Sequence, residues 1–165
     1  MTSIFKFIQR VKTKLFPTLH IPHQEWLLAR LAPLFRKQEI TTPHGMRLFL
    51  DRGDSLLLSL HDEHEPLTCR EIASLLHEGD TVVDVGAHIG YFTTLFAKCV
   101  GASGKVVAIE PSKSNFALLS KNLEINNIRN VDAFNGAASR AAGTVNLREG
   151  DSDSNFKIYG SNSQH

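Results

Sequence analysis

The chain has 165 residues, of which 42% are hydrophobic and 21% are charged, and its formal net charge is +1. This length and composition are those of a single globular domain, and no apolar run approaches the roughly 18 residues that a membrane span needs. The near-neutral charge gives no indication of a nucleic-acid partner, so none is expected.

Residues 1–24 carry basic side chains and no acid, and their apolar residues recur at helical spacing. The pattern favours a helix that docks on the domain after it. It also fits an organelle presequence, or a helix that contacts a membrane surface or a partner through residues 1–16. We therefore expect an N-terminal helical extension over residues 1–40 and a main domain over residues 41–165.

The main domain opens with two short strands, predicted over residues 46–50 and 56–60 on either side of an Asp-Arg-Gly-Asp turn. A charged loop follows over residues 61–65. Its two histidines have the spacing of metal ligands, but no third ligand is visible nearby and a solvated loop is favoured. A helix then begins at Thr68, which forms a capping box with Glu71.

The two cysteines, Cys69 and Cys99, stand far apart and form no C-x-x-C pair. This spacing indicates neither a zinc site nor a disulfide framework. We expect reduced thiols in a cytoplasmic protein, and no metal.

The most informative segment is residues 81–93, where four β-prone residues and an acid run into a glycine turn and then into a helix. Such a turn brings backbone N–H groups and a helix dipole close to a bound small molecule. A second apolar strand, residues 105–109, ends at Glu110. An acid at this point suits the ribose hydroxyls of a nucleoside. Together the two elements predict a nucleoside-containing cofactor.

The glycine order indicates which cofactor this is. A dinucleotide fingerprint reads G-x-G-x-x-G/A, and its second glycine makes room for the pyrophosphate. Here the order is G-x-x-x-G from Gly86 to Gly90, with His88 in the place of that second glycine. S-adenosylmethionine (AdoMet) has no phosphate and no such requirement, so AdoMet is favoured over a nicotinamide dinucleotide. A phosphate-binding loop is excluded because no G-K-[ST] follows.

The alternation of elements continues after Glu110. A helix is predicted from residues 111–112 to residues 126–127, a third strand over residues 131–134, and further strand candidates over residues 144–147 and 156–159. Strands that alternate with helices over short links predict an α/β fold with a parallel sheet and right-handed crossovers.

At residues 79–93 the chain resembles motif I of AdoMet-dependent methyltransferases, and in detail the FkbM-type family of O-methyltransferases. The resemblance extends through the V-x-A-x-E-P-[ST] segment of residues 106–112 and the Asn-Gly-Ala-Ala-Ser segment of residues 135–139. It implies a Rossmann-like class I methyltransferase sheet that ends early, after the third or fourth strand. It also implies a hydroxyl of a sugar, glycan or natural product as the methyl acceptor, so that the partner is a small molecule or a glycan.

The predicted cofactor-binding residues follow the three strand ends: Asp84, Gly86, Ala87, His88, Gly90, Tyr91, Glu110, Pro111, Asn135, Gly136 and Ala137. For His88, a contact with AdoMet and a partly exposed position in the loop without such a contact are equally favoured. No catalytic base can be assigned. The alternative function is a non-catalytic remnant or interaction module that binds AdoMet weakly or not at all.

Overall fold

The computed structural model describes residues 37–59, 63–140, 143, 145–149 and 156–161. By its contacts the chain divides into two units, residues 1–36 and residues 37–165. The predicted N-terminal helical extension, residues 1–40, lies outside the described residues except for residues 37–40, of which residues 39–40 belong to a strand.

The centre of the second unit is a three-stranded parallel sheet in the order β3-β4-β5. Its strands are β3 (Thr81–Val85), β4 (Lys105–Ile109) and β5 (Val131–Phe134). Helix α4 (Tyr91–Val100) connects the first two strands, and α5 (Lys113–Ile125) connects the second and third. The predicted α/β fold with a parallel sheet is confirmed, and the three predicted strands have the observed bounds.

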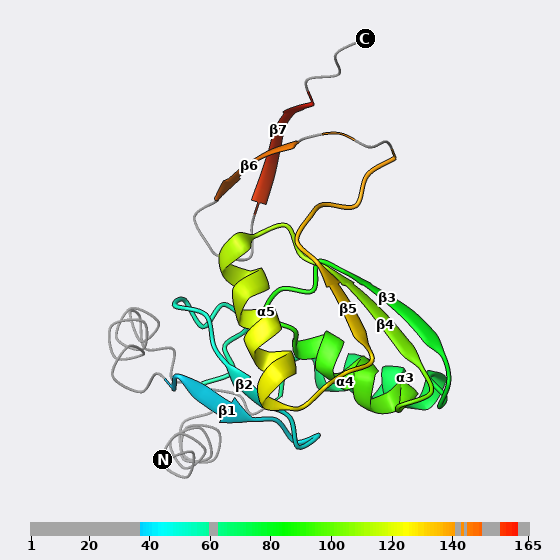
Figure 1. Cartoon of the computed structure of the whole chain (residues 1–165). Coiled ribbons are helices and arrows are strands. Elements are labelled where there is room, and N and C mark those ends of the chain that lie inside the picture. Colours follow the sequence, from blue (N-terminus) through cyan, green and yellow to red (C-terminus); the bar gives the residue numbers. More distant parts are fainter. Residues whose placement is uncertain (1–36, 60–62, 141–142, 144, 150–155, 162–165) are drawn as a thin grey trace, which may run out of the picture. The chain divides into compact units, whose positions relative to one another are not determined.

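The sheet buries one of its faces. Val106 and Ala108 of β4 are fully buried, whereas Val83, Val85 and Phe134 are 59%, 62% and 56% exposed. Figure 1 shows the helices that follow β3 and β4 on the same side of the sheet. This arrangement follows from right-handed crossovers between consecutive parallel strands, which place successive helices on one face.

A small antiparallel sheet precedes the parallel one, and its pairing differs from our expectation. Strand β1 (Glu39–Thr41) pairs with β2 (Arg47–Phe49), so that Ile40 lies opposite Leu48. The strand predicted over residues 46–50 is confirmed. The strand predicted over residues 56–60 is wrong for its described part, because residues 56–59 form turns.

Two buried aspartates cause these turns. The carboxylate of Asp54 accepts hydrogen bonds from the backbone N–H groups of Leu58 and Ser59, both at 2.8 Å. Asp51 accepts one from the backbone N–H of Ser55 at 3.0 Å. Aspartate side chains that bind the backbone a few residues ahead offer it an alternative to strand pairing.

Helix α3 (Pro66–Leu75) also begins differently from the prediction. Its N-cap is Glu65 in a left-handed conformation, and Pro66 occupies the first turn, where its missing N–H needs no partner. The hydroxyl of Thr68 donates to the carboxylate of Glu65 at 3.0 Å. The predicted capping box of Thr68 with Glu71 is therefore wrong, and the helix starts two residues earlier.

Asn122 of α5 and Asn126, the C-cap residue of that helix, hold the small sheet against the domain. Asn122, which is fully buried, accepts from Phe49 N–H at 2.7 Å and donates to the carbonyl oxygens of Phe49 and Ile89. Asn126, one helical turn later, makes the same paired contact with the backbone of Arg47. Because Ile89 belongs to the glycine turn, Asn122 links that turn to β2.

The last elements are β6 (Val145–Glu149) and β7 (Phe156–Ser161), which pair antiparallel in a two-stranded sheet of their own. Both strand candidates at the end of the chain are thus confirmed.

Within the described part of the chain, none of the helices is both long enough and apolar enough to cross a bilayer.

Candidate functional site

The candidate site lies where β3, β4 and β5 end, at one edge of the parallel sheet. In open α/β sheets, ligands bind beyond the carboxyl ends of the strands. The predicted residues follow these three ends: the glycine turn after β3, Glu110 after β4, and Asn135 after β5. The sheet register brings Val85 beside Ile109 and Ile109 beside Phe134, so the three segments start side by side.

The turn after β3 is held by the strand beside it. The backbone N–H groups of Gly86 and Ala87 both donate to the carbonyl oxygen of Ile109, at 2.8 and 3.1 Å. Gly90 N–H donates to Ala87 at 2.8 Å. We expected these groups to face a ligand, but the protein itself uses them. A ligand would therefore meet the turn through its open side.

That open side lies at Gly86, and the two glycines of the turn have different roles. Both have positive φ angles, 84° for Gly86 and 90° for Gly90, which favour glycine. A Cβ atom on Gly90 would lie 2.6 Å from Leu119 Cδ1, whereas one on Gly86 would meet no atom within 4 Å. Gly90 is therefore required by the packing of α5, and Gly86 leaves free space beside the strand end.

Glu110 connects the three segments of the site. Its side chain is only 3% exposed, and one carboxylate oxygen accepts from His88 N–H while the other accepts from Ser112 N–H, both at 2.8 Å. Its backbone carbonyl accepts from Gly136 N–H and from the amide of Asn135. Each carboxylate oxygen has a second lone pair, so two further hydrogen bonds to vicinal hydroxyls remain possible.

The second acid of the site is Asp84, at the end of β3. It accepts a hydrogen bond from the Thr93 hydroxyl at 2.5 Å. Burial raises the pKa of the Asp84 carboxyl, and the charge of Glu110 adds to this effect, while the Thr93 hydrogen bond opposes it. Two carboxylates at neighbouring strand ends favour a ligand that carries positive charge.

His88 faces the turn of residues 51–55. Its Nε2 lies 3.1 Å from the hydroxyl of Ser55 and 3.9 Å from Asp51 Oδ2, and its side chain is 14% exposed. The Ser55 hydroxyl in turn donates to Asp51 Oδ2. The His88 side chain thus anchors a loop to the glycine turn. The Asp-Arg-Gly-Asp signature predicted a turn here, but no sequence signal indicated its partner.

Tyr91, one of the predicted cofactor-binding residues, makes contacts with other parts of the protein. Its ring is 4% exposed, and its hydroxyl accepts from His64 N–H at 3.1 Å and lies 3.7 Å from Cys69 Sγ. Burial raises the pKa of the Tyr91 hydroxyl, so it stays protonated. Tyr91 therefore links the start of α4 to the start of α3.

The remaining predicted residues follow β4 and β5. The amide of Asn135 donates to the carbonyl oxygens of Glu110 and Pro111, at 2.8 and 3.2 Å. A Cβ atom on Gly136 would meet nothing within 4 Å. Asn135 is exposed, and Gly136 and Ala137 are half-buried. The segment is anchored at its start and accessible beyond it.

The comparisons with known proteins identify one family. Residues 40–145 match the family described as the TRM5/TYW2 methyltransferase domain. None of the curated proteins matches the sequence significantly. This match supports the AdoMet-dependent methyltransferases as a class, but it does not support the FkbM-type family in particular.

Several solved methyltransferases resemble parts of the chain. TYW2 of M. jannaschii in complex with AdoMet is 27% identical, with a TM-score of 0.45 over 59% of this chain and 43% of that one. Trm5b of Pyrococcus abyssi is 25% identical, with a TM-score of 0.44 over 58% and 27%. A putative rRNA methylase of Clostridium thermocellum is 28% identical, with a TM-score of 0.42 over 43% and 39%. The chain thus spans less than half the length of each of these proteins.

Proposed function

Because the chain belongs to the TRM5/TYW2 methyltransferase domain family, we propose that it forms the AdoMet-binding part of an enzyme that methylates tRNA. The methyltransferase class and AdoMet as the cofactor of that class agree with the sequence prediction. The acceptor is the new element of the proposal.

The predicted acceptor is corrected by the family. We expected a small molecule or a glycan and no nucleic acid, but members of the TRM5/TYW2 family act on tRNA. The net charge of +1 misled us because it averages over the whole chain. A nucleic acid responds to the charge near its own binding surface. O-methylation of a sugar or natural product finds no support.

The observation that carries the cofactor proposal is the pair of carboxylates, Asp84 and Glu110, beside the open space at Gly86. AdoMet carries positive charge on its sulfonium and its ammonium group, and two nearby carboxylates favour both. We propose that the ribose hydroxyls bind Glu110, and that the methionine part lies along Gly86, Ala87 and His88. The adenine would lie against Pro111 and the segment from Asn135 to Ala137.

Gly90 and Tyr91 have supporting roles in this proposal. Gly90 lets α5 pack against the glycine turn, and Tyr91 fixes the start of α4 through His64. Neither residue is needed as a direct contact to AdoMet.

Methyl transfer from a sulfonium is an in-line displacement, in which the enzyme aligns the nucleophile, the methyl group and the sulfur. The bond from sulfur to the methyl carbon breaks as the bond to the nucleotide forms, and the sulfonium becomes a neutral thioether. The site described here holds the donor. We assign no residue to the activation of the acceptor.

Calorimetry and a transfer assay test the two levels of this proposal. The full chain should bind AdoMet and not NAD, and any transfer of the labelled methyl group of AdoMet should be to bulk tRNA and not to a glycan or a small-molecule alcohol. Binding of AdoMet with transfer to a non-nucleic acceptor would overturn the tRNA assignment. Absence of AdoMet binding by a folded chain would overturn the cofactor site and favour the non-catalytic alternative.

A further inference from the structure

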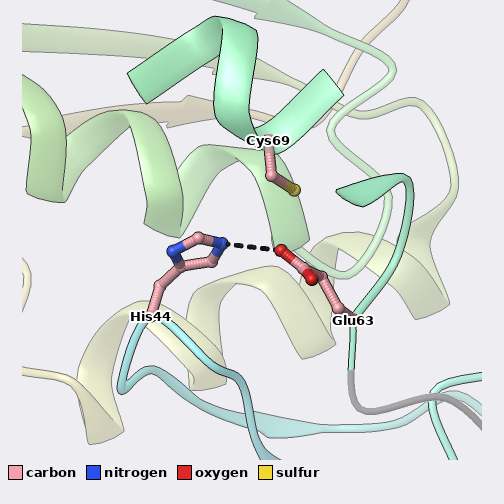
Figure 2. Close-up of side chains that lie close together, drawn as sticks. All are labelled: His44, Glu63 and Cys69. Carbon is pink, nitrogen blue, oxygen red and sulfur yellow. Dashed lines mark ion pairs between the residues drawn. The ribbon is translucent and has the colours of Figure 1, made fainter. Parts of the chain in front are cut away.

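We propose that His44, Glu63 and Cys69 bind a zinc ion, outside the cofactor site and independently of the proposed reaction. The three residues come from separate segments: the turn between β1 and β2, the residues before α3, and the first turns of α3 itself. Figure 2 shows their side chains converging on one point. Among the described residues, this is the one group of three or more possible ligands that gathers its donor atoms in this way.

The spacing of the donor atoms suits a small divalent ion. His44 Nε2 lies 3.3 Å from Glu63 Oε1, and the three donor atoms lie within 4.8 Å of one another. Zinc bonds of about 2.0–2.3 Å in tetrahedral geometry place pairs of ligand atoms roughly 3.3–3.6 Å apart. The imidazole and the carboxylate already have this separation, and a side-chain shift of about 1 Å would bring the third ligand to the same distance.

The imidazole of His44 has a bonding requirement that the protein alone does not meet. Its Nε2 atom is buried from solvent and makes no hydrogen bond. The contact with Glu63 has the length of an ion pair but not the geometry of a hydrogen bond. A buried polar atom without a hydrogen bond is unfavourable. A metal ion between Nε2 and Oε1 would satisfy both groups.

The thiol of Cys69 determines which metal is favoured. A set of one thiolate, one imidazole and one carboxylate suits zinc, whereas magnesium and calcium prefer oxygen ligands alone. Cys69 is fully buried, and its Sγ lies 3.2 Å from the carbonyl oxygen of His64 and 3.7 Å from the Tyr91 hydroxyl. Zinc would displace the thiol proton to solvent, and the Tyr91 hydroxyl is placed to donate to the resulting thiolate.

Such a site would stabilise the part of the domain that precedes the parallel sheet. It would fix the β1–β2 turn to α3, and Tyr91 would connect it to the start of α4. The Lys98 ammonium donates to the backbone oxygen of His44 and opposes a cation there, but the carboxylate and thiolate charges of the ligands outweigh it. Three protein ligands leave the fourth zinc position for water.

Cobalt titration of the reduced, metal-free full chain tests the proposal, because a cobalt–thiolate bond gives a charge-transfer band in the near ultraviolet. The wild-type chain should show this band, and added zinc should remove it by displacing cobalt. Cys69→Ser should abolish the band, whereas Cys99→Ser, at the other cysteine, should retain it. His44→Gln and Glu63→Gln should each lower the affinity by about ten-fold or more.

A second measurement covers the case in which Cys69→Ser fails to fold. Zinc should raise the melting temperature of the wild-type chain and of Cys99→Ser, and it should do so far less for His44→Gln and Glu63→Gln, whose side chains are half-buried. No thiolate band in the wild-type chain, or a band that persists in Cys69→Ser, would overturn the proposal. So would equal stabilisation of all variants by zinc. AdoMet binding is measured separately on the same samples, so that failure of one site is distinguishable from failure of the other.

Discussion

The carboxylate of Glu110 accepts a hydrogen bond from the backbone N–H of His88 at 2.8 Å, and this contact joins the end of β4 to the glycine turn after β3. The same carboxylate holds Ser112, the N-cap of α5, through its other oxygen. An acid in this position therefore shapes the turn on which the cofactor is proposed to lie, as well as offering lone pairs to a ribose.

Replacement of Glu110 should affect both folding and cofactor binding. In Glu110→Gln the side-chain amide would place a donor against the N–H of either His88 or Ser112. The loss of one buried hydrogen bond should lower the free energy of unfolding by about 1–3 kcal/mol. AdoMet affinity measured by calorimetry should fall at least about ten-fold, which corresponds to about 1.4 kcal/mol. Glu124→Gln, an exposed acid on α5, is the matched control and should change neither quantity. Full AdoMet affinity in a folded Glu110→Gln chain would contradict the ribose assignment.

Replacement of Asp84 should weaken cofactor binding without lowering the stability of the fold. Its pKa is raised in the folded state, so between its ordinary value of 3.8 and the raised value the folded chain binds more protons than the unfolded chain. Stability should therefore fall as the pH rises through this window. Asp84→Asn removes the buried charge and keeps an oxygen for the Thr93 hydroxyl. It should maintain or raise the melting temperature at neutral pH and flatten its pH dependence.

The same substitution removes a charge that favours cationic AdoMet, so calorimetry should show affinity at least about ten-fold weaker. Unchanged binding together with a lower melting temperature would mean that Asp84 serves the fold alone.

Alanine substitutions at three glycines should separate backbone strain from steric contact. Gly90→Ala adds a Cβ atom 2.6 Å from Leu119 Cδ1 at a positive φ angle and should destabilise the chain by about 1–3 kcal/mol. Gly86→Ala meets no neighbour but has a φ angle of 84°, so only strain, about 1 kcal/mol, is expected. Gly136→Ala has neither defect and should stay within about 0.5 kcal/mol of the wild type. Chemical denaturation gives all three values.

The glycine series also tests the cofactor proposal. Gly86→Ala should weaken AdoMet binding more than its effect on stability accounts for, because its methyl group would occupy the open space beside the strand end. An equal loss of affinity in Gly90→Ala at a temperature where both variants are folded would argue that AdoMet does not approach Gly86.

Asn122 and Asn126 provide a test of buried against exposed hydrogen bonding. Asn122→Ala would leave the half-buried N–H of Phe49 and the buried carbonyl of Ile89 without their side-chain partner, which should lower the free energy of unfolding by about 2–3 kcal/mol. Asn126→Ala removes the matching contacts to Arg47, where water can replace them, and about 0.5–1 kcal/mol is expected. Urea unfolding of both variants measures the difference. Equal losses of unfolding free energy in the two variants would mean that burial does not determine the strength of these hydrogen bonds.

The sequence by itself determined the parallel sheet and its helices. The three predicted strands are observed over residues 81–85, 105–109 and 131–134. Apolar runs bounded by glycines and polar turns indicate the strands, and helical periodicity indicates the helices. Both are local signals that each segment carries alone. The strand ends then located the candidate site, since parallel strands that alternate with helices end on the same edge. The G-x-x-x-G turn and Glu110 favoured AdoMet over a dinucleotide on the same local grounds.

Only the tertiary structure decided what each of these residues touches. The turns of residues 51–59 depend on Asp51 and Asp54 binding backbone groups, and the partner of His88 is a serine from that loop. Tyr91 faces α3, and Gly90 is required by Leu119, which lies 29 positions later in the sequence. The proposed zinc ligands are the clearest case. We expected no metal because residues 61–65 offered no third ligand, and Cys69 was far from any second cysteine. The fold brings His44 from one turn and Cys69 from a helix to Glu63, and convergence of residues that are distant in sequence leaves no periodic or spacing signal in the chain.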